Sequence, residues 1–293
     1  MKKICAILAC YNPDVFLIEQ VESIQAQENV IVDILVFDDN SSIGLDVLSE
    51  IGLKNQVQVV KNLSGSGSAG KNFLRSVLAV DASAYDFFCF SDQDDIWFPN
   101  KLSAAIDEMD KYSCDGYSSN LLIYENGSVT GLLDKSTKPQ TAYDYQFQGG
   151  SAGNTYVIRA NLMQTLQSAL RCYNFLDHVG TVSHDWIIYA IARSYQYRWH
   201  FDKSAYIYYR QHANNVYGAR KNIWQRVRML TGNWYSNGVW IVSQYTTGPA
   251  PAIDLGASFL GKLKKIPSVF KFRRNKVESA ICYLFWLFLY KSR

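Results

Sequence analysis

Four short apolar-rich runs in the first 110 residues, each leading into a polar loop, constrain the fold most strongly. The runs lie at 4–9, 31–37, 56–61 and 87–90, and helix-like segments at 14–26 and 70–80 alternate with them. Strands that are apolar on both faces are typical of a parallel sheet covered by helices on both sides. The sequence therefore predicts an α/β fold with a mostly parallel central sheet, whose polar strand ends meet at one edge.

The pattern changes after about residue 110. We expect a hairpin strand at 117–124 that turns at 125–127, a Gly-rich stretch at 149–153 and a strand near 155–158. Ser183 is placed to cap a helix with Asp185 in its first turn, and 198–209 predicts a further strand. We therefore divide the chain into a domain at 1–215, with halves 1–110 and 111–215, and a basic helical tail at 216–293.

Charge is distributed very unevenly along the chain. Residues 1–202 hold 14 Lys and Arg against 24 Asp and Glu, whereas 203–293 hold 15 against 2. A basic, aromatic tail favours an anionic partner, and a membrane surface fits better than nucleic acid, which the acidic body would repel. The apolar stretch 280–290 is too short to span roughly 30 Å of hydrocarbon as a helix. The alternative is a tail packed against the body or a partner protein.

Composition excludes several classes of protein. With 48% apolar residues the chain is neither disordered nor collagen-like. Its six cysteines are scattered without a C-x-x-C pair, which argues against a disulfide framework or a structural zinc site. The short apolar run at the N-terminus ends without a small-residue cleavage site. We therefore expect a first buried strand there, and a cytosolic protein.

A cluster of acidic residues directly follows the apolar run at 87–90. Asp92, Asp94 and Asp95 emerge together at the predicted strand end. Adjacent carboxylates repel one another unless a cation neutralises them, and oxygen ligands suit Mg²⁺ or Mn²⁺. The alternative is a solvated acidic turn.

Two further loops lie where a nucleotide could bind. The cluster 38–42 (Asp-Asp-Asn-Ser-Ser) predicts either a base or ribose contact or a simple Asx turn. The loop from Gly65 to Lys71 nearly fits a phosphate-binding P-loop, but Asn72 stands where that motif needs Ser or Thr to ligate Mg²⁺. A loop whose backbone approaches a nucleotide is the better interpretation.

Together these segments resemble a known family. The elements 9–12 (Ala-Cys-Tyr-Asn), 36–41 (Val-Phe-Asp-Asp-Asn-Ser), 70–72 (Gly-Lys-Asn) and 90–97 (Phe-Ser-Asp-Gln-Asp-Asp-Ile-Trp) are similar, in order and spacing, to those of family 2 glycosyltransferases of the GT-A fold. The resemblance covers roughly residues 1–215. With Ser-His-Asp-Trp at 183–186 and Tyr-Arg-Gln-His at 209–212, the chain looks most like bacterial rhamnosyltransferase-type members that build surface polysaccharides.

The resemblance implies a role for each matching residue. Tyr11, Asp39 and Lys71 would contact the nucleotide, Asp92 and Asp95 the donor, and Gly149, Gly150, Gly153, Trp97 and Trp186 the acceptor side. Asp92, Asp94 and His212 would hold Mg²⁺ or Mn²⁺, and Asp185 would be the general base, although His184 stands where many members have Glu. Each role has a structural alternative: core packing for the two tryptophans and Tyr11, a favourable interaction with the helix dipole for Asp185, and an ordinary histidine for His212.

The implied reaction is inverting transfer of a sugar from a dTDP or UDP donor to a lipid-linked or growing surface glycan. L-Rhamnose is the candidate sugar, and the basic tail would place the enzyme on the inner face of the cell membrane. Two other classes stay open: nucleotidyl or phosphoryl transfer through the 65–71 loop, and a non-catalytic membrane-bound scaffold. On the tail hypothesis, removing 261–293 would release the protein from anionic vesicles and leave the donor site intact.

Overall fold

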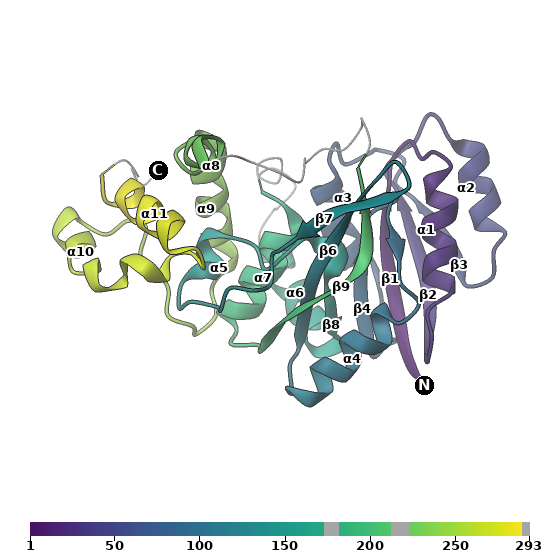
Figure 1. Ribbon diagram of the computed structural model, residues 1–293, viewed down its shortest axis with the longest axis horizontal. Coiled ribbons are helices and arrows are strands. Elements are labelled where there is room, and N and C mark those ends of the chain that lie inside the picture. The colour runs from purple at the N-terminus through teal and green to yellow at the C-terminus, as the bar shows by residue number, and fades with distance from the viewer. Residues whose placement is uncertain (173–181, 212–222, 289–293) are drawn as a thin grey trace.

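The computed structural model describes residues 1–172, 182–211 and 223–288 of the chain. In these residues nine strands form one sheet in the order β3-β2-β1-β4-β8-β6-β9-β5, with β7 paired to β6 (Figure 1). The strands are β1 (Lys2–Cys10), β2 (Val30–Asp38), β3 (Val57–Lys61), β4 (Phe87–Ser91), β5 (Ile96–Trp97), β6 (Gly116–Glu125), β7 (Ser128–Leu133), β8 (Val157–Arg159) and β9 (Trp199–Arg210).

The first half of the sheet is parallel, as the apolar runs predict. β1 pairs in parallel with both β2 and β4, and β2 pairs in parallel with β3. Side chains alternate along β1: Ile4, Ala6 and Leu8 enter one hydrophobic core, while Cys5 and Ile7 enter the other. Each face of the strand is therefore buried, which explains why its sequence is continuously apolar.

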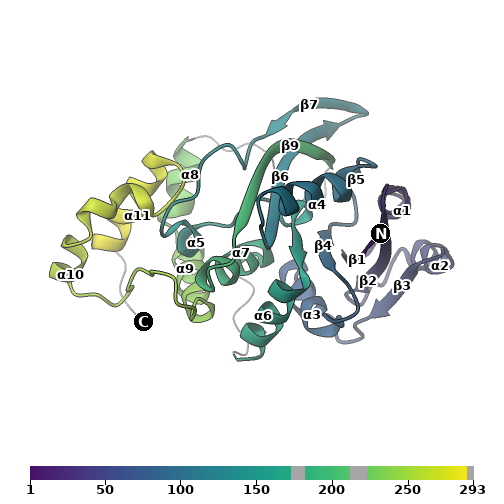
Figure 2. The same ribbon diagram turned by 90° about the horizontal axis from the view of Figure 1, so that it is seen from below.

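Helices cover both faces of this sheet. The helices α1 (Phe16–Gln25), α2 (Leu45–Gly52) and α4 (Lys101–Lys111) lie on one face, and α3 (Ala69–Ala79), α6 (Ala160–Arg171) and α7 (His184–Ser194) lie on the other. Figure 2 shows α4 separated by β4 from α3 and α6. The predicted α/β fold with helices on both faces is confirmed.

The second half mixes strand directions. β8 runs antiparallel to both β4 and β6, whereas β9 is parallel to β6 and antiparallel to β5. The predicted hairpin is β6–β7, and it turns at Asn126 and Gly127, which both have positive φ (50° and 80°). Two successive positive φ angles are typical of a tight hairpin turn, and Asn-Gly is the residue pair that best tolerates them.

The basic tail forms helices that pack on the body. In its described part, α8 (Ile223–Leu230), α9 (Asn233–Tyr245), α10 (Phe259–Leu263), the 3₁₀ turn η3 (Ile266–Lys271) and α11 (Lys276–Phe288) gather at the end of the molecule opposite α1 and α2 (Figure 1). Tyr235, Phe272 and Trp286 are buried in the same core as α7. The short helix α5 (Asp144–Phe147) lies between the tail and the sheet. Much of the tail's apolar surface is therefore buried against the body of the protein.

Candidate active site

Two of the polar clusters at the strand ends are joined directly. Gln93, which follows β4, accepts a hydrogen bond from the backbone N–H of Tyr11 (2.8 Å) and donates one to its carbonyl (3.2 Å). Tyr11 follows β1, and its side chain is 57% exposed. The structure thus brings the predicted nucleotide residue Tyr11 beside the acidic loop and leaves its ring free to meet a ligand.

Asp39 lies at the end of β2 and is tied to the Gly/Ser loop. Its carboxylate accepts bonds from the Asn62 side chain (2.8 Å) and from the backbone N–H and the hydroxyl of Ser66 (2.6 Å each). The side chain is 7% exposed. A loop that resembles a phosphate cradle is therefore held in place by the very carboxylate expected to meet the base.

The start of α3 does not support the P-loop alternative. Asn72 donates its side-chain N–H to the carbonyl of Phe37 (2.7 Å) and is buried, so it ties α3 to β2. The backbone N–H of Lys71 is capped by the hydroxyl of Ser68 (3.3 Å). The side chain of Lys71 is half-buried, at the end of the helix that faces the nucleotide edge. Asn72 thus has a structural role where a P-loop needs a metal ligand.

Asp95 is the most deeply buried residue of the acidic loop. It is fully buried and accepts bonds from the Asn154 side chain and from the backbone N–H of Arg210 (3.2 Å). The guanidinium of Arg210 also donates to the carbonyl of Asp94 (2.9 Å). Burial, followed by repulsion from Asp94 and Asp92, raises the pKa of Asp95 well above its usual value. The acidic loop is thus fixed from β9 and from the Gly-rich stretch.

The pKa of Asp92 is affected by carboxylates from two segments of the chain. Burial is the largest cause that raises its pKa to about 7, and repulsion by Asp94 and by Asp185 adds to it. Asp185 comes from α7, so the structure brings the predicted base and the acidic loop into one electrostatic site. A divalent cation bound to Asp92 and Asp94 would offset this repulsion, so the donor set fits Mg²⁺ or Mn²⁺.

A complete protein-made metal site is not seen in the described part of the chain. There, no group of three or more His, Cys, Asp or Glu side chains is close enough to hold a metal ion. His212, the predicted third ligand, lies outside the described residues. A metal ion held by Asp92 and Asp94 would therefore need further ligands, which a bound diphosphate would supply.

Asp185 lies in the first turn of α7 and against the Gly-rich loop. One of its carboxylate oxygens accepts the backbone N–H of Trp186 (2.7 Å). A Cβ placed on Gly149 would lie 3.6 Å from the other oxygen. The hydroxyl of Tyr156 links the two segments, because it donates to the carbonyl of Asp185 (3.2 Å) and accepts the N–H of Gly150 (2.9 Å). The half-buried carboxylate thus keeps one oxygen directed toward the loop.

His184 packs beneath this site. Its ring stacks on Phe73, with centroids 3.9 Å apart, and its Nε2 is buried without a hydrogen-bond partner among the described residues. Burial lowers the pKa of His184 to about 4, against a smaller opposing effect of Asp185. The imidazole is therefore neutral at physiological pH and adds no positive charge beside the predicted base.

The two tryptophans predicted on the acceptor side are buried. Trp97 is 2% exposed, and the ammonium of Lys101 lies 3.4 Å from the centre of its ring. Trp186 is 4% exposed, donates to the carbonyl of Tyr145 (3.0 Å) and stacks on Tyr235. Neither ring presents a face to a sugar, so this geometry favours the packing alternative. Gly150 is also buried, with its N–H bonded to the hydroxyl of Tyr156.

Sequence reasoning missed several residues that hold the site. Gln93, Asn154, Arg210 and Arg274 act through side-chain bonds to the backbone or carboxylates of the site. Gln93 could have been noticed, because it lies inside the acidic motif. Arg210 lies inside the element 209–212, but its partners lie more than 100 positions earlier in the sequence. Asn154 and Arg274 are also distant from their partners and carry no local signal.

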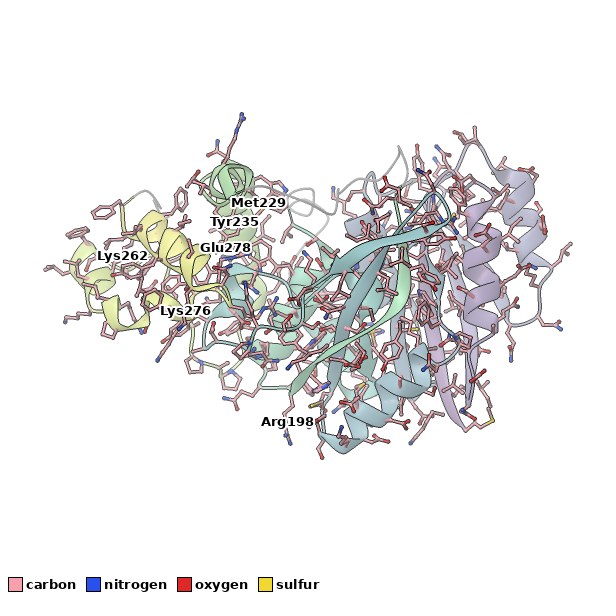
Figure 3. All side chains as sticks on the ribbon, viewed as in Figure 1. Arg198, Met229, Tyr235, Lys262, Lys276 and Glu278 are labelled. Atoms are coloured by element: carbon pink, nitrogen blue, oxygen red, sulfur yellow. The ribbon has the colours of Figure 1, made fainter. Side chains whose placement is uncertain are left out.

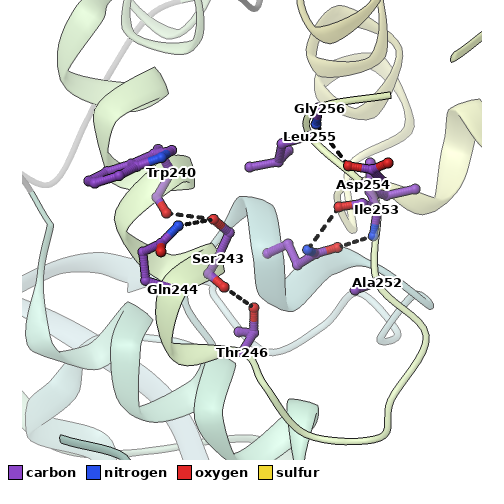
Figure 4. A pocket seen from close by; sticks show the side chains of 10 residues that line it. Trp240, Ser243, Gln244, Thr246, Ala252, Ile253, Asp254, Leu255 and Gly256 are labelled. Carbon is purple, nitrogen blue, oxygen red and sulfur yellow. Dashed lines mark hydrogen bonds between the residues drawn. The ribbon is translucent and has the colours of Figure 1, made fainter. Parts of the chain in front are cut away.

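A separate hollow of about 330 Å³ lies between α9 and the segment 252–256 (Figure 4). Trp240, Gln244 and Asp254 are among the residues that line it. The side chain of Gln146 forms part of the lining. It accepts a hydrogen bond from the backbone N–H of Ile253 (2.7 Å) and donates one to the carbonyl of the same residue (3.4 Å). Its lining includes none of the predicted site residues that the structure describes, so the candidate active site remains at the strand ends.

Comparison with known proteins agrees with the geometry of this site. The model of glycosyl transferase family 2 matches residues 5–169. The chain is also 33% identical over 279 residues to the dTDP-rhamnosyl transferase RfbG of Shigella flexneri, which covers 92% of this chain and 96% of RfbG. The chain therefore belongs to glycosyl transferase family 2, and it is a glycosyltransferase.

Solved structures support the fold. S. aureus TarS has a TM-score of 0.53 at 19% identity, covering 70% of this chain but only 36% of that structure. TarS 1–349 in complex with UDP-GlcNAc has a TM-score of 0.53 at 15% identity, covering 98% of this chain and 72% of that one. At this level of identity the likeness shows the fold alone, and it confirms the predicted GT-A architecture.

Proposed function

We propose that this enzyme transfers L-rhamnose from a dTDP donor, with inversion, to a hydroxyl of a lipid-linked or growing surface glycan. The similarity to RfbG along 92% of the chain supports the choice of donor. The observation that carries the chemistry is the position of Asp185. It comes from α7, next to the Gly-rich loop, yet lies close enough to Asp92 to raise that residue's pKa.

This arrangement separates two chemical tasks. An inverting transfer requires the acceptor hydroxyl to lose its proton while it attacks the anomeric carbon from the face opposite the leaving diphosphate. Asp185, which has one carboxylate oxygen directed toward the loop, takes that proton as general base. Asp92 and Asp94 would hold the divalent ion, which when bound supplies positive charge that offsets the charge of the diphosphate.

The nucleotide would bind across the ends of β1, β2 and β4. Tyr11 presents an exposed ring for the base, and Asp39 and Lys71 face the same edge. Asp95 is fully buried beneath the acidic loop and accepts hydrogen bonds from Arg210 and Asn154. Through these bonds it fixes the loop and so orients Asp94 and the donor. The proposal also assigns His212 to the metal or diphosphate.

A peripheral position on the inner membrane face completes the proposal. Apolar side chains of the tail that remain exposed include Phe259, Leu260, Phe270, Leu284 and Phe288. The rings of Phe259 and Phe288 lie 6.1 Å apart, so α10 and α11 share one apolar surface, and exposed lysines occur in the same segment. Within the described residues, each helix is too short or too polar to cross a bilayer. Apolar side chains with neighbouring lysines suit an anionic lipid surface, where a lipid-linked acceptor would be found.

The test is a thermal-shift panel of nucleoside diphosphates and sugar nucleotides, each with Mn²⁺ and with chelator. A ligand that binds only the folded state raises the midpoint of unfolding. We expect a metal-dependent shift with dTDP that is lost in Asp94→Asn. The Asp185→Asn variant should keep that shift but lose transfer from dTDP-L-rhamnose by at least 100-fold, in line with the loss of a general base.

Other outcomes would overturn parts of the proposal. If only a UDP donor raised the unfolding midpoint, the proposed dTDP donor would be wrong, and the proposed mechanism would be unaffected. A shift with a triphosphate only would favour the transfer chemistry of the 65–71 loop. Full transfer activity in Asp185→Asn would show that another group removes the proton.

A further inference from the structure

The Gly-rich loop beside Asp185 is held by a residue of the tail. The guanidinium of Arg274 donates from one nitrogen to the carbonyls of Gly149 (2.9 Å) and Gly150 (2.7 Å). The backbone N–H of Arg274 donates to the side-chain oxygen of Gln148 (3.2 Å). Three consecutive residues of the loop are therefore bonded to one residue that lies 124 to 126 positions later in the sequence.

Arg274 is itself fixed from two sides. Its guanidinium lies 4.5 Å from the centre of the Phe201 ring, and one nitrogen lies 3.9 Å from a carboxylate oxygen of Asp144. Asp144 is fully buried and also binds Arg193 (3.2 Å) and the hydroxyl of Tyr189 (3.0 Å). Both oxygens of Asp144 already accept a hydrogen bond, and Nη1 of Arg274 has no hydrogen-bond partner among the described residues, so Asp144 attracts Arg274 by charge alone.

The neighbouring arginine fastens the same stretch of tail. Arg273 donates to the carbonyl of Phe147, to the hydroxyl of Tyr235 (3.2 Å) and to Glu278 (3.1 Å). Tyr235 of α9 and Glu278 of α11 lie at the junction of these helices (Figure 3). The bonds of Arg273 therefore fix the backbone next to Arg274 and so the position from which Arg274 reaches the loop.

The loop that Arg274 holds leaves little room to move toward α7. A Cβ on Gly150 would lie 3.0 Å from a ring carbon of Tyr189, and one on Gly149 would lie 3.4 Å from the Cα of Trp186. The loop backbone thus forms the surface next to the carboxylate of Asp185. A shift of the loop would change the space in which an acceptor hydroxyl must approach that carboxylate.

We propose that Arg274 is a positioning residue that holds the backbone of Gly149 and Gly150 against Asp185 and so shapes the acceptor subsite. The catalytic part of this inference rests on the proposed role of Asp185. The tail then has a function in the reaction that is separate from any contact with lipid. Arg274 touches neither the donor edge nor the acidic loop in any contact described above, so its effect should be confined to the acceptor side.

The experiment compares Arg274→Gln with Arg274→Lys and with Arg198→Gln. Arg198 is an exposed arginine on the surface (Figure 3), which makes it a matched control for the same substitution. The first readout is amide hydrogen exchange and needs no substrate. We expect exchange at 149–153 to accelerate at least tenfold in Arg274→Gln, with β1–β4 and the control unchanged. Arg274→Lys keeps a cation near Asp144 and should give a smaller effect, which guards against general misfolding.

The second readout is steady-state transfer from dTDP-L-rhamnose to octyl glycosides. We expect the acceptor KM to rise at least tenfold in Arg274→Gln, while the donor KM stays within twofold and added guanidinium restores part of the loss. Unchanged exchange at 149–153 would overturn the holding role. Faster exchange with an unchanged acceptor KM would overturn the role in the reaction. If the parent enzyme transfers no sugar, the proposed function fails, and hydrogen exchange still decides whether Arg274 holds the loop.

Discussion

Gly153 and His184 occupy adjoining space: a Cβ built on Gly153 would lie 2.2 Å from Nε2 of the imidazole. Gly153 belongs to the Gly-rich stretch, and His184 begins α7, one residue before the predicted base. The absence of a side chain at position 153 therefore allows the histidine to pack at full depth against Phe73. The two segments that carry the acceptor side are fitted to each other at this point.

Gly153→Ala should push His184 out of place. Overpacking of a buried contact costs about 1–3 kcal/mol of unfolding free energy. Removing the imidazole in Gly153→Ala/His184→Ala should relieve most of that cost, so the double-mutant cycle should show clear coupling. Chemical denaturation of the four proteins measures it. Additive effects would mean that the loop can move away from α7 without loss.

Acid should destabilise the protein through His184. Its pKa is about 4 when folded, while an unfolded histidine titrates near 6.5. Between these values the unfolded chain binds a proton that the folded chain does not, so stability falls as the pH drops from about 6.5 towards 4. His184→Leu should flatten the dependence in this window by up to about 1.4 kcal/mol per pH unit. Parallel slopes in urea denaturation from pH 7 to pH 4.5 would contradict this.

Asp39→Asn should weaken the nucleotide edge. The carboxylate accepts three hydrogen bonds from Asn62 and Ser66, and an amide would turn an NH₂ group toward one of these donors. An unsatisfied buried donor costs about 1–3 kcal/mol. We expect lower thermal stability and at least tenfold weaker dTDP binding. Asp46→Asn, at an exposed site on α2, should leave both unchanged. Equal behaviour of the two variants would rule out a special role for Asp39.

Membrane binding by the tail should depend on exposed lysines and should be tested without truncation. Deleting 261–293 would remove Phe272 and Trp286 from the shared core and take the Arg273 and Cys282 partners away from Tyr235, so we expect an unstable or aggregated protein. The triple change Lys264→Gln, Lys271→Gln and Lys276→Gln alters only exposed side chains. Each lysine near an anionic surface contributes about 1 kcal/mol. Sedimentation with phosphatidylglycerol vesicles should show at least tenfold weaker binding, and unchanged binding would refute the membrane proposal.

The strand half of the fold could be predicted because burial on both faces leaves a plain pattern in the sequence. The apolar runs fall within β1, β2 and β4, and strands in one parallel sheet bring Tyr11, Asp39 and Asp92 to a common edge. Such motifs are local, so their residue types and their positions at strand ends already carry the information.

The contacts of the tail could not be predicted in this way. An amphipathic helix has the same periodicity whether its apolar face meets lipid or a protein core, and here Tyr235 and Trp286 meet the core. The burial of Trp97 could not be predicted for a similar reason. A tryptophan directly after the acidic motif has the same sequence context whether its ring faces a sugar or packs against Lys101. Arg274 lies 125 positions from Gly149, and nothing in either local sequence indicates the other.

That separation has a consequence for how the enzyme comes into being. Translation delivers the strand ends that carry Tyr11, Asp39 and Asp92 long before it delivers the arginine that fastens Gly149 and Gly150. A nascent chain could thus assemble its nucleotide edge while its acceptor side is still unfastened. A product that ended before Arg274 would lack Trp286 together with the arginine, so the instability of its core and the loosening of its acceptor loop would arise from one and the same loss.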